Sequence, residues 1–236
     1  MLTSTRDRKR LFARHCRAGV LLGCLLAGAS PTFAGGAVLV TGPMGSYQVP
    51  VQSLDELRFH SVVAQRYDYS CGSAALATLL SYHYARPVNE IEAFDWMYET
   101  GDQAQIRARG FSMMDMKRYL GEAQGLASDG FRISLERLEE LGLPAIVMIE
   151  PEGYRHFVVV KGIRDDRVLV GDPAFGIREY PRRVFNAIRS NDIFFIIRDE
   201  LELARQSVNN RGSWAAITRA PTRQAIPPES LSALTL

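Results

Sequence analysis

Several features of other protein classes are missing from this chain of 236 residues. Its longest apolar stretch, residues 18–29, has about 12 residues, whereas a helix that crosses a bilayer needs roughly 20. Beyond residue 34 there is no cluster of lysines and arginines that could displace the counterions of a nucleic acid. A phosphate-binding Gly-Lys-Ser/Thr loop is also absent. We therefore expect no nucleic acid partner, no ATP, and no membrane span after the N-terminal stretch.

The formal charge of +2 is distributed unevenly. The first 34 residues hold six basic side chains and one acidic one, which leaves 22 basic and 25 acidic side chains for the rest. The basic residues end at Arg17, just before the apolar stretch, and Thr32-Phe33-Ala34 has the small residues of a cleavage site. This pattern predicts a signal peptide over residues 1–34 and a periplasmic or secreted protein. A lipoprotein signal with Cys24 as the modified residue is the alternative.

Cysteine is scarce, with three residues at positions 16, 24 and 71. The first two lie in the predicted signal, so Cys71 is the only cysteine of the exported chain. Secreted proteins usually carry cysteines in pairs, and an unpaired one indicates a reactive thiol or an intermolecular disulfide. A small buried hydrophobic side chain is the other interpretation of Cys71.

The order of the expected elements favours an α+β fold. Helices are predicted first, over residues 71–84, 88–99, 112–122 and 134–141, from strong helix formers and apolar periodicity. Short β-branched and aromatic runs follow, at residues 145–149, 156–162, 167–171 and 193–197. Helices before strands indicate N-terminal helices packed on a C-terminal antiparallel sheet. We expect an extended segment at residues 35–58, a catalytic domain at 59–198 and a weakly ordered tail at 199–236.

Cys71 has the position that a cysteine nucleophile needs. It begins a predicted helix, where the partial positive charge of the helix terminus favours a thiolate and the free backbone N–H can bind an oxyanion. Gln65, six residues earlier, has a neutral amide suited to be a second oxyanion donor. Its other interpretation is an ordinary loop glutamine.

A base for Cys71 can be sought among three histidines outside the signal peptide. His83 lies on the same helix, about 18 Å from Cys71, and is too far away. His60 is expected to be a surface or core side chain, and His156 opens a strand. If this strand pairs with residues 167–172 across a loop centred near residue 164, His156 faces Asp172, which could orient the imidazole. His156 has no partners at metal-ligand spacing, so no metal or other cofactor is expected.

These residues resemble the motifs of the C39 peptidase family of double-glycine leader peptidases. The resemblance covers about residues 60–198 and includes Gln65-x5-Cys71-Gly72, His156-Phe157-Val158-Val159-Val160 and Asp172-Pro173. It implies a papain-like cysteine peptidase fold, with Cys71, His156 and Asp172 as the triad and Gln65 in the oxyanion hole. The chain is most similar to stand-alone, secreted members, some of which accompany bacterial functional-amyloid export systems. Transporter members often carry Asp directly before the cysteine, whereas this chain has Ser70, which leaves the double-glycine specificity open.

The predicted function is hydrolysis of a peptide bond, in a protein or leader peptide processed during export. The implied partner is a polypeptide substrate, such as a component of an export or fibre-assembly system. Two alternatives stay open. A thioester on Cys71 could pass to an amine or alcohol, as in an acyltransferase or amidase. The chain could also be a catalytically silent module that binds a leader.

Overall fold

The computed structural model describes residues 37–42, 45–50 and 53–218. The predicted signal peptide, with the alternative lipid site at Cys24, lies outside these residues, as does the end of the expected tail from residue 219. In the part that is described, no helix is long and apolar enough to cross a membrane. The elements, in chain order, are β1 (Ala37–Gly42), β2 (Gly45–Pro50), α1 (Leu54–Phe59), α2 (Cys71–His83), α3 (Glu90–Thr100), α4 (Gln103–Arg109), α5 (Met113–Glu122), β3 (Ser128–Arg132), α6 (Leu135–Leu141), β4 (Ala145–Ile149), a 3-10 turn η1 (Pro151–Gly153), β5 (His156–Arg164), β6 (Arg167–Asp172), β7 (Gly176–Pro181), α7 (Arg182–Ile188), β8 (Arg189–Ile197), α8 (Leu201–Ser207) and α9 (Arg211–Thr218).

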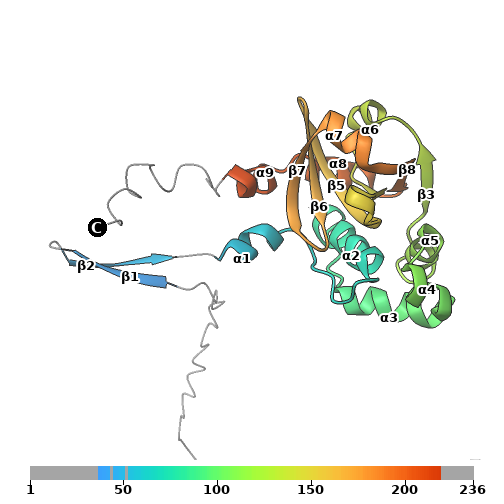
Figure 1. The fold of residues 1–236 in the computed structure, drawn as a ribbon, viewed down its shortest axis with the longest axis horizontal. Helices are drawn as coiled ribbons and strands as arrows, with labels where there is room; N and C mark the ends of the chain where they lie inside the picture. Colours follow the sequence, from blue (N-terminus) through green and yellow to red (C-terminus); the bar gives the residue numbers. More distant parts are fainter. Residues whose placement is uncertain (1–36, 43–44, 51–52, 219–236) are drawn as a thin grey trace, which may run out of the picture.

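A six-stranded antiparallel sheet forms the C-terminal half of the domain. Its strand order is β3-β8-β4-β5-β6-β7, and α2 packs against its central strand β5 (Figure 1). Residues 71–80 of α2 are all buried, because helices cover the side of α2 that faces away from the sheet. A helix enclosed in this way is largely apolar, as its Ala- and Leu-rich sequence shows, and its buried Ser73 and His83 have polar partners. The α+β class, with N-terminal helices on an antiparallel sheet, is confirmed.

Several short elements were not predicted from the sequence. The four predicted helices correspond to α2, α3, α5 and α6, and the four predicted strands to β4, β5, β6 and β8. Four further elements, α4, β3, β7 and α7, have between five and seven residues each. The expected extended segment at residues 35–58 contains the hairpin β1–β2, but it also contains most of α1, whose N-cap Ser53 and Glu56 form a capping box.

The register predicted for the β5–β6 hairpin is wrong by two to three residues. The observed partners include Arg164 with Arg167 and Val159 with Gly171, and a bulge interrupts the ladder at Lys161. The connection is therefore a two-residue turn, and Asp165 within it adopts φ 50°. His156 and Asp172 are consequently not paired in the ladder, although their side chains do form a hydrogen bond.

Residues 199–218 contain the helices α8 and α9, in contrast to the weakly ordered tail that was expected there. Asn209, which follows α8, donates its backbone N–H to Lys161 O on β5 at 3.1 Å. A Cβ on Gly162 would lie 2.4 Å from Asn209 Oδ1, so only glycine allows this close approach. Arg164 stacks on the ring of Trp214 in α9 at 4.8 Å. These tertiary contacts with β5 hold segments whose polar composition alone does not predict order.

A buried polar chain also links α8 to α2 and β5. Lys161 Nζ lies 2.9 Å from Ser61 O and 3.1 Å from His83 Nε2, and His83 Nδ1 lies 2.7 Å from Ser207 Oγ. Lysine has donors only, so His83 Nε2 accepts from Lys161 and Nδ1–H donates to Ser207. Burial lowers the pKa of Lys161 to about 7, and burial with the Lys161 charge lowers the pKa of His83 well below its usual value. His83 thus has a structural role in the core.

The buried Lys161 predicts that stability rises with pH above neutrality. In the unfolded chain its pKa is about 10.4, so between pH 7 and that value the unfolded state binds a proton that the folded state lacks. The free energy of unfolding should therefore increase, by at most about 1.4 kcal/mol per pH unit. Urea unfolding of wild type and Lys161→Met at pH 7, 8 and 9 measures this. The variant should lose the increase, and parallel curves for the two proteins would contradict the prediction.

Candidate active site

Cys71 lies at the start of α2, under the segment that joins α4 to α5. The residue before it, Ser70, closes a turn in which Ser70 N–H donates to Tyr67 O at 3.0 Å. The Ser70 hydroxyl also accepts from Tyr67 N–H at 3.1 Å. A Cβ on Gly72 would lie 3.0 Å from Phe111 Cβ, so a glycine at this position lets Phe111 approach the helix start. The Cys71 side chain is 8% exposed, and it is the single cysteine among the described residues.

Two opposed effects act on the Cys71 thiol. Burial raises its pKa, and the negative charge of Asp172 adds to the rise. The backbone N–H groups of Phe157, Gly72 and Cys71 itself lower the pKa but do not compensate for burial. The backbone N–H groups at the start of the helix do favour the thiolate, as expected from the sequence, but the pKa of Cys71 is raised overall. A thiol in this environment needs a neighbouring base to become a nucleophile.

His156 and Asp172 form a buried pair at one end of the sheet. His156 Nε2 lies 3.0 Å from Asp172 Oδ2, with the two side chains 1% and 0% exposed. The second carboxylate oxygen of Asp172 accepts from the backbone N–H of Ala174 at 2.9 Å and of Phe175 at 3.2 Å. The two backbone N–H groups bind Oδ1 and fix the orientation of the carboxylate. The other oxygen, Oδ2, therefore faces Nε2 of His156. His156 Nδ1 is left for other partners, and it lies 3.4 Å from Tyr154 O.

Tyr154 covers the imidazole, a contact that the sequence did not indicate. The rings of Tyr154 and His156 have centroids 4.8 Å apart, and Tyr154 is 43% exposed. It follows η1, in which Glu152 and Gly153 both have positive φ angles of 53° and 82°. Tight turns with two such residues are characteristic of Gly-containing connections. Glu152-Gly153 therefore indicated a turn at this place in the sequence, but it did not indicate that Tyr154 stacks on His156.

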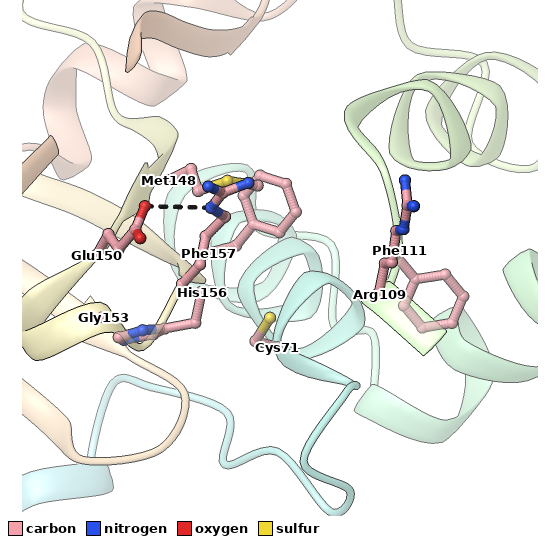
Figure 2. Close-up of a pocket in the computed structure, with 9 residues that line it drawn as sticks. Cys71, Arg109, Phe111, Met148, Glu150, Gly153, His156 and Phe157 are labelled. Atoms are coloured by element: carbon pink, nitrogen blue, oxygen red, sulfur yellow. Dashed lines mark hydrogen bonds and ion pairs between the residues drawn. The ribbon is translucent and has the colours of Figure 1, made fainter. Parts of the chain in front are cut away.

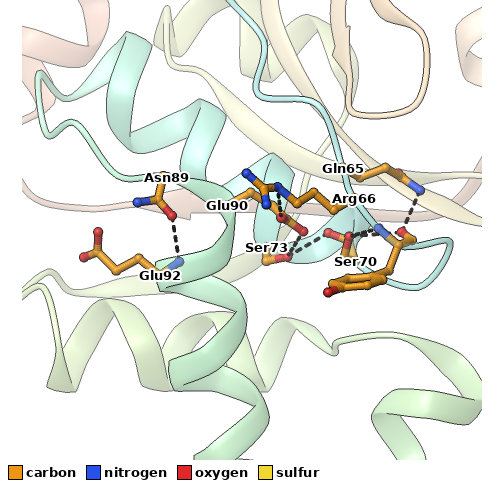
Figure 3. A network of polar contacts seen from close by, with 8 residues as sticks. Gln65, Arg66, Ser70, Ser73, Asn89, Glu90 and Glu92 are labelled. Atoms are coloured by element: carbon orange, nitrogen blue, oxygen red, sulfur yellow. Dashed lines mark hydrogen bonds and ion pairs between the residues drawn. The ribbon is translucent and has the colours of Figure 1, made fainter.

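Gln65 is held beside the Asp172 turn by its backbone. Its N–H donates to Pro173 O at 3.0 Å, which brings the segment before Cys71 against the end of β6. Its side-chain Nε2 donates to Tyr67 O at 3.0 Å, and its Oε1 is buried without a hydrogen-bond partner among the described residues (Figure 3). The structure thus brings Gln65 to the site, with its amide N–H directed at the local turn.

A second polar network holds the segment before Cys71 against α3. Ser73 Oγ donates to Ser70 O at 2.8 Å and to Glu90 Oε1 at 3.3 Å, and Arg66 Nε lies 4.0 Å from Glu90 Oε2 (Figure 3). Glu90 is 3% exposed and begins α3. The network ties the first turn of α2, the segment before it and α3 into one unit. Sequence reasoning did not identify Arg66, Ser73 or Glu90.

Cys71 and His156 line one open cavity of about 450 Å³, which we call the Cys71 cavity. Its remaining wall includes Phe157 of β5, Met148 and Glu150 at the end of β4, and Arg109 and Phe111 at the end of α4 (Figure 2). Arg109 and Phe111 lie across the opening from Glu150 and His156 (Figure 2). Of the other histidines, His60 is exposed and contacts Leu57 O at 3.2 Å, while His83 is in the core. The site therefore contains a thiol, an imidazole and a carboxylate bound to that imidazole.

The chain is similar to known peptidases in sequence. A family model described as the Peptidase C39 family matches residues 60–200. A curated protein from Pseudomonas aeruginosa, called "Probable functional amyloid protease FapD", is 43% identical over 147 residues, which span 62% of this chain and 65% of the relative. The protein of the same name from Pseudomonas fluorescens is 38% identical over 189 residues, spanning 80% of this chain and 82% of the relative.

The chain is also similar to two solved structures. The peptidase domain of Streptococcus ComA, a bi-functional ABC transporter involved in a quorum sensing pathway, is 18% identical with a TM-score of 0.49, over 58% of this chain and 96% of that chain. A double glycine motif protease from an AMS/PCAT transporter, solved in complex with the leader peptide, is 26% identical with a TM-score of 0.46, over 58% of this chain and 89% of that chain.

Proposed function

Because the chain belongs to the peptidase C39 family of cysteine peptidases, we propose that Cys71 is the nucleophile of a peptide-bond hydrolysis, with His156 as base and acid and Asp172 as its orienting residue. The observation that carries the proposal is the buried His156–Asp172 pair, whose imidazole lines the same cavity as the Cys71 thiol. A buried imidazole bound to a carboxylate has one defined tautomer and a stabilised cationic form, and both are required of a general base.

The reaction begins with a proton transfer. Since Asp172 occupies Nε2 of His156, Nδ1 accepts the thiol proton as the sulfur of Cys71 bonds to the substrate carbonyl carbon. His156 then donates that proton to the amine nitrogen, the C–N bond breaks, and a thioester remains on Cys71. A water molecule gives a proton to His156 and attacks the thioester. The carboxylic acid leaves, and the proton returns to the sulfur.

The negative oxygen of the tetrahedral intermediate needs donors in the cavity. The backbone N–H of Cys71 lies in the first turn of α2, where it has no partner within the helix. We assign Gln65 as the second donor, which requires its Nε2 to turn from Tyr67 O towards the substrate. The buried Oε1 of Gln65, which has no hydrogen-bond partner within the described part of the chain, supports this, because the present orientation of the amide leaves one of its polar atoms unsatisfied.

The biological substrate is proposed to be an exported polypeptide. Two relatives at 43% and 38% identity have names that connect them with functional amyloid, which supports a component of a fibre or export system as substrate. Export of this chain is supported by the cationic and apolar N-terminal residues and by the cleavage pattern that ends at Ala34. The exported form would begin at Gly35, and the mass of the protein in the periplasmic fraction measures this.

Peptide hydrolysis can be tested without knowledge of the substrate. The purified exported chain is incubated with a peptide library prepared from a digested proteome, and new termini are identified by mass spectrometry. Wild type should generate termini that share a sequence preference, and Cys71→Ala should generate none. Peptides acylated on amines without new termini would indicate acyl transfer instead. Peptides that are retained but left intact by wild type would contradict hydrolysis and favour a leader-binding module.

A further inference from the structure

The Cys71 cavity continues into a second cavity of about 400 Å³ along α4 and α5, which we call the α4–α5 cavity. The two share four residues: Arg109, Phe111, Met148 and Arg155. A peptide bound at Cys71 and extending along this surface therefore passes between two arginines and over two apolar side chains. The mechanism proposed above uses none of these four residues.

Arg109 has an unengaged positive charge. Among the described residues its guanidinium has no hydrogen bond or ion pair, and its side chain is exposed. Its position is nevertheless fixed by the backbone, because Gly110 ends α4 with φ 77° and a Cβ there would lie 3.1 Å from Tyr69 O. Tyr69 is two residues before Cys71. The close approach of these two backbones thus places Arg109 at the mouth of the Cys71 cavity (Figure 2).

Arg155 faces the same passage from the sheet side. Its Nε lies 3.2 Å from Glu150 Oε2, and no other ion pair or hydrogen bond engages its guanidinium in the described part of the chain. The two terminal nitrogens of Arg155 therefore remain free for a further acceptor, in the geometry that suits a carboxylate. Glu150 is the competing anion in the Cys71 cavity.

The other charges in the passage are already engaged. Asp102 accepts from Gln105 N–H and Nε2 at the start of α4. Asp115 accepts from Ser112 N–H and Oγ in a capping box and lies 3.9 Å from Arg118, which also donates to Thr100 O. The two cavities together are lined by three basic and three acidic side chains, but in the Cys71 cavity itself two arginines with free donors face one carboxylate, Glu150.

We propose that Arg109 and Arg155 form a carboxylate-binding subsite, which selects peptide substrates that carry an Asp or Glu side chain close to the scissile bond. The proposal rests on the proposed function, because it concerns which peptides reach Cys71. The side chains of Phe111 and Met148 line the same two cavities as the arginines, and the methylene groups of an acidic side chain can pack against them.

The test profiles cleavage sites in the peptide library for wild type, Arg109→Gln, Arg155→Gln and Glu150→Gln. Wild type should cut preferentially where Asp or Glu occupies one fixed position relative to the scissile bond. Replacing that residue by Asn or Gln in a defined peptide should lower kcat/KM by about tenfold, and either arginine variant should abolish the difference. Glu150→Gln should increase it, because the competing carboxylate is removed. Arg183→Gln is the matched control, since Arg183 is exposed on α7 and lines neither cavity.

Two further measurements distinguish a side-chain carboxylate from a terminal one, and failure of the subsite from failure of hydrolysis. Defined peptides with a free or amidated C-terminus distinguish a side-chain carboxylate from a terminal one, and dependence on the free terminus alone would overturn the side-chain assignment. Capture of the library on immobilised Cys71→Ser, with and without the two arginine substitutions, measures binding directly. If wild type cuts nothing, the proposed hydrolysis fails, and the capture arm still decides the subsite. Cleavage and capture without acidic enrichment would overturn the subsite while leaving hydrolysis intact.

Discussion

The His156→Gln variant is expected to hydrolyse a library-selected peptide with a kcat/KM at least about 10³-fold below that of wild type. The burial that raises the pKa of Cys71 keeps the thiol protonated, so attack depends on a base that removes the proton. Glutamine has no basic nitrogen, yet its amide N–H can replace the bond from Nε2 to Asp172. The variant therefore separates loss of the base from loss of the buried polar pair. His156→Ala would leave the Asp172 carboxylate buried and partly unpartnered, which costs stability as well.

Alkylation of Cys71 by iodoacetamide gives a second measurement on the same variant. Without His156 the rate should follow the titration of a lone buried thiol, with a pKa above the ordinary value of about 8.5. Wild type should react at lower pH, because the imidazole shares the proton. His60→Gln serves as the control, since His60 is exposed and its ring contacts Leu57 O. A His156→Gln enzyme within about tenfold of wild type, or one with an unchanged alkylation profile, would refute the assignment of His156 as the base.

The sequence predicted that the side chains of His156 and Asp172 lie next to each other, and they do, although the strand register assumed for β5 and β6 is wrong. The prediction depended on two strands joined by a short turn, which the sequence defines well. It did not depend strongly on register, because a carboxylate that begins the turn after β6 can reach the first residue of β5 diagonally. The shift itself came from the two-residue turn at Asp165, which displaces the register by three residues, and the bulge at Lys161 reduces the displacement to two. Lys161 is directed into the core, where it binds Ser61 O and His83.

The features that escaped prediction share a physical origin. Arg109 lies on α4, a helix of seven residues, which is too short for apolar periodicity to identify. The helices α8 and α9 depend on contacts with β5, such as Asn209 with Gly162, that no local pattern encodes. The direction of the Gln65 amide is decided by Tyr67 O, a backbone group two residues away. The sequence therefore indicates which chemical groups gather at Cys71, while the specificity of the surrounding surface emerges only from the packed chain.

Asp172→Asn is expected to retain the fold and to lower kcat by about 10²- to 10⁴-fold. The reason lies in the oxygen that does not contact His156. Asp172 Oδ1 accepts from the backbone N–H groups of Ala174 and Phe175, so an asparagine must direct its own oxygen to these donors. Its NH₂ group then faces His156 Nε2 and donates to it. Nε2 must become the acceptor, and the ring proton moves to Nδ1. In that tautomer Nδ1 cannot take the thiol proton of Cys71.

Two comparison variants separate the effect on the His156 tautomer from an effect on stability. Asp172→Ala removes the acceptor for both N–H groups as well as the partner of His156, so it should lower both activity and the free energy of unfolding, the latter by about 2–4 kcal/mol. Asp166→Asn places the same substitution on an exposed residue in the turn at the other end of the hairpin and should change neither. Activity is measured with the library-selected peptide and stability by urea unfolding. If Asp172→Asn were as active as wild type, the carboxylate would serve only to close the turn at Ala174 and Phe175, and His156 would hold its reactive tautomer by other contacts.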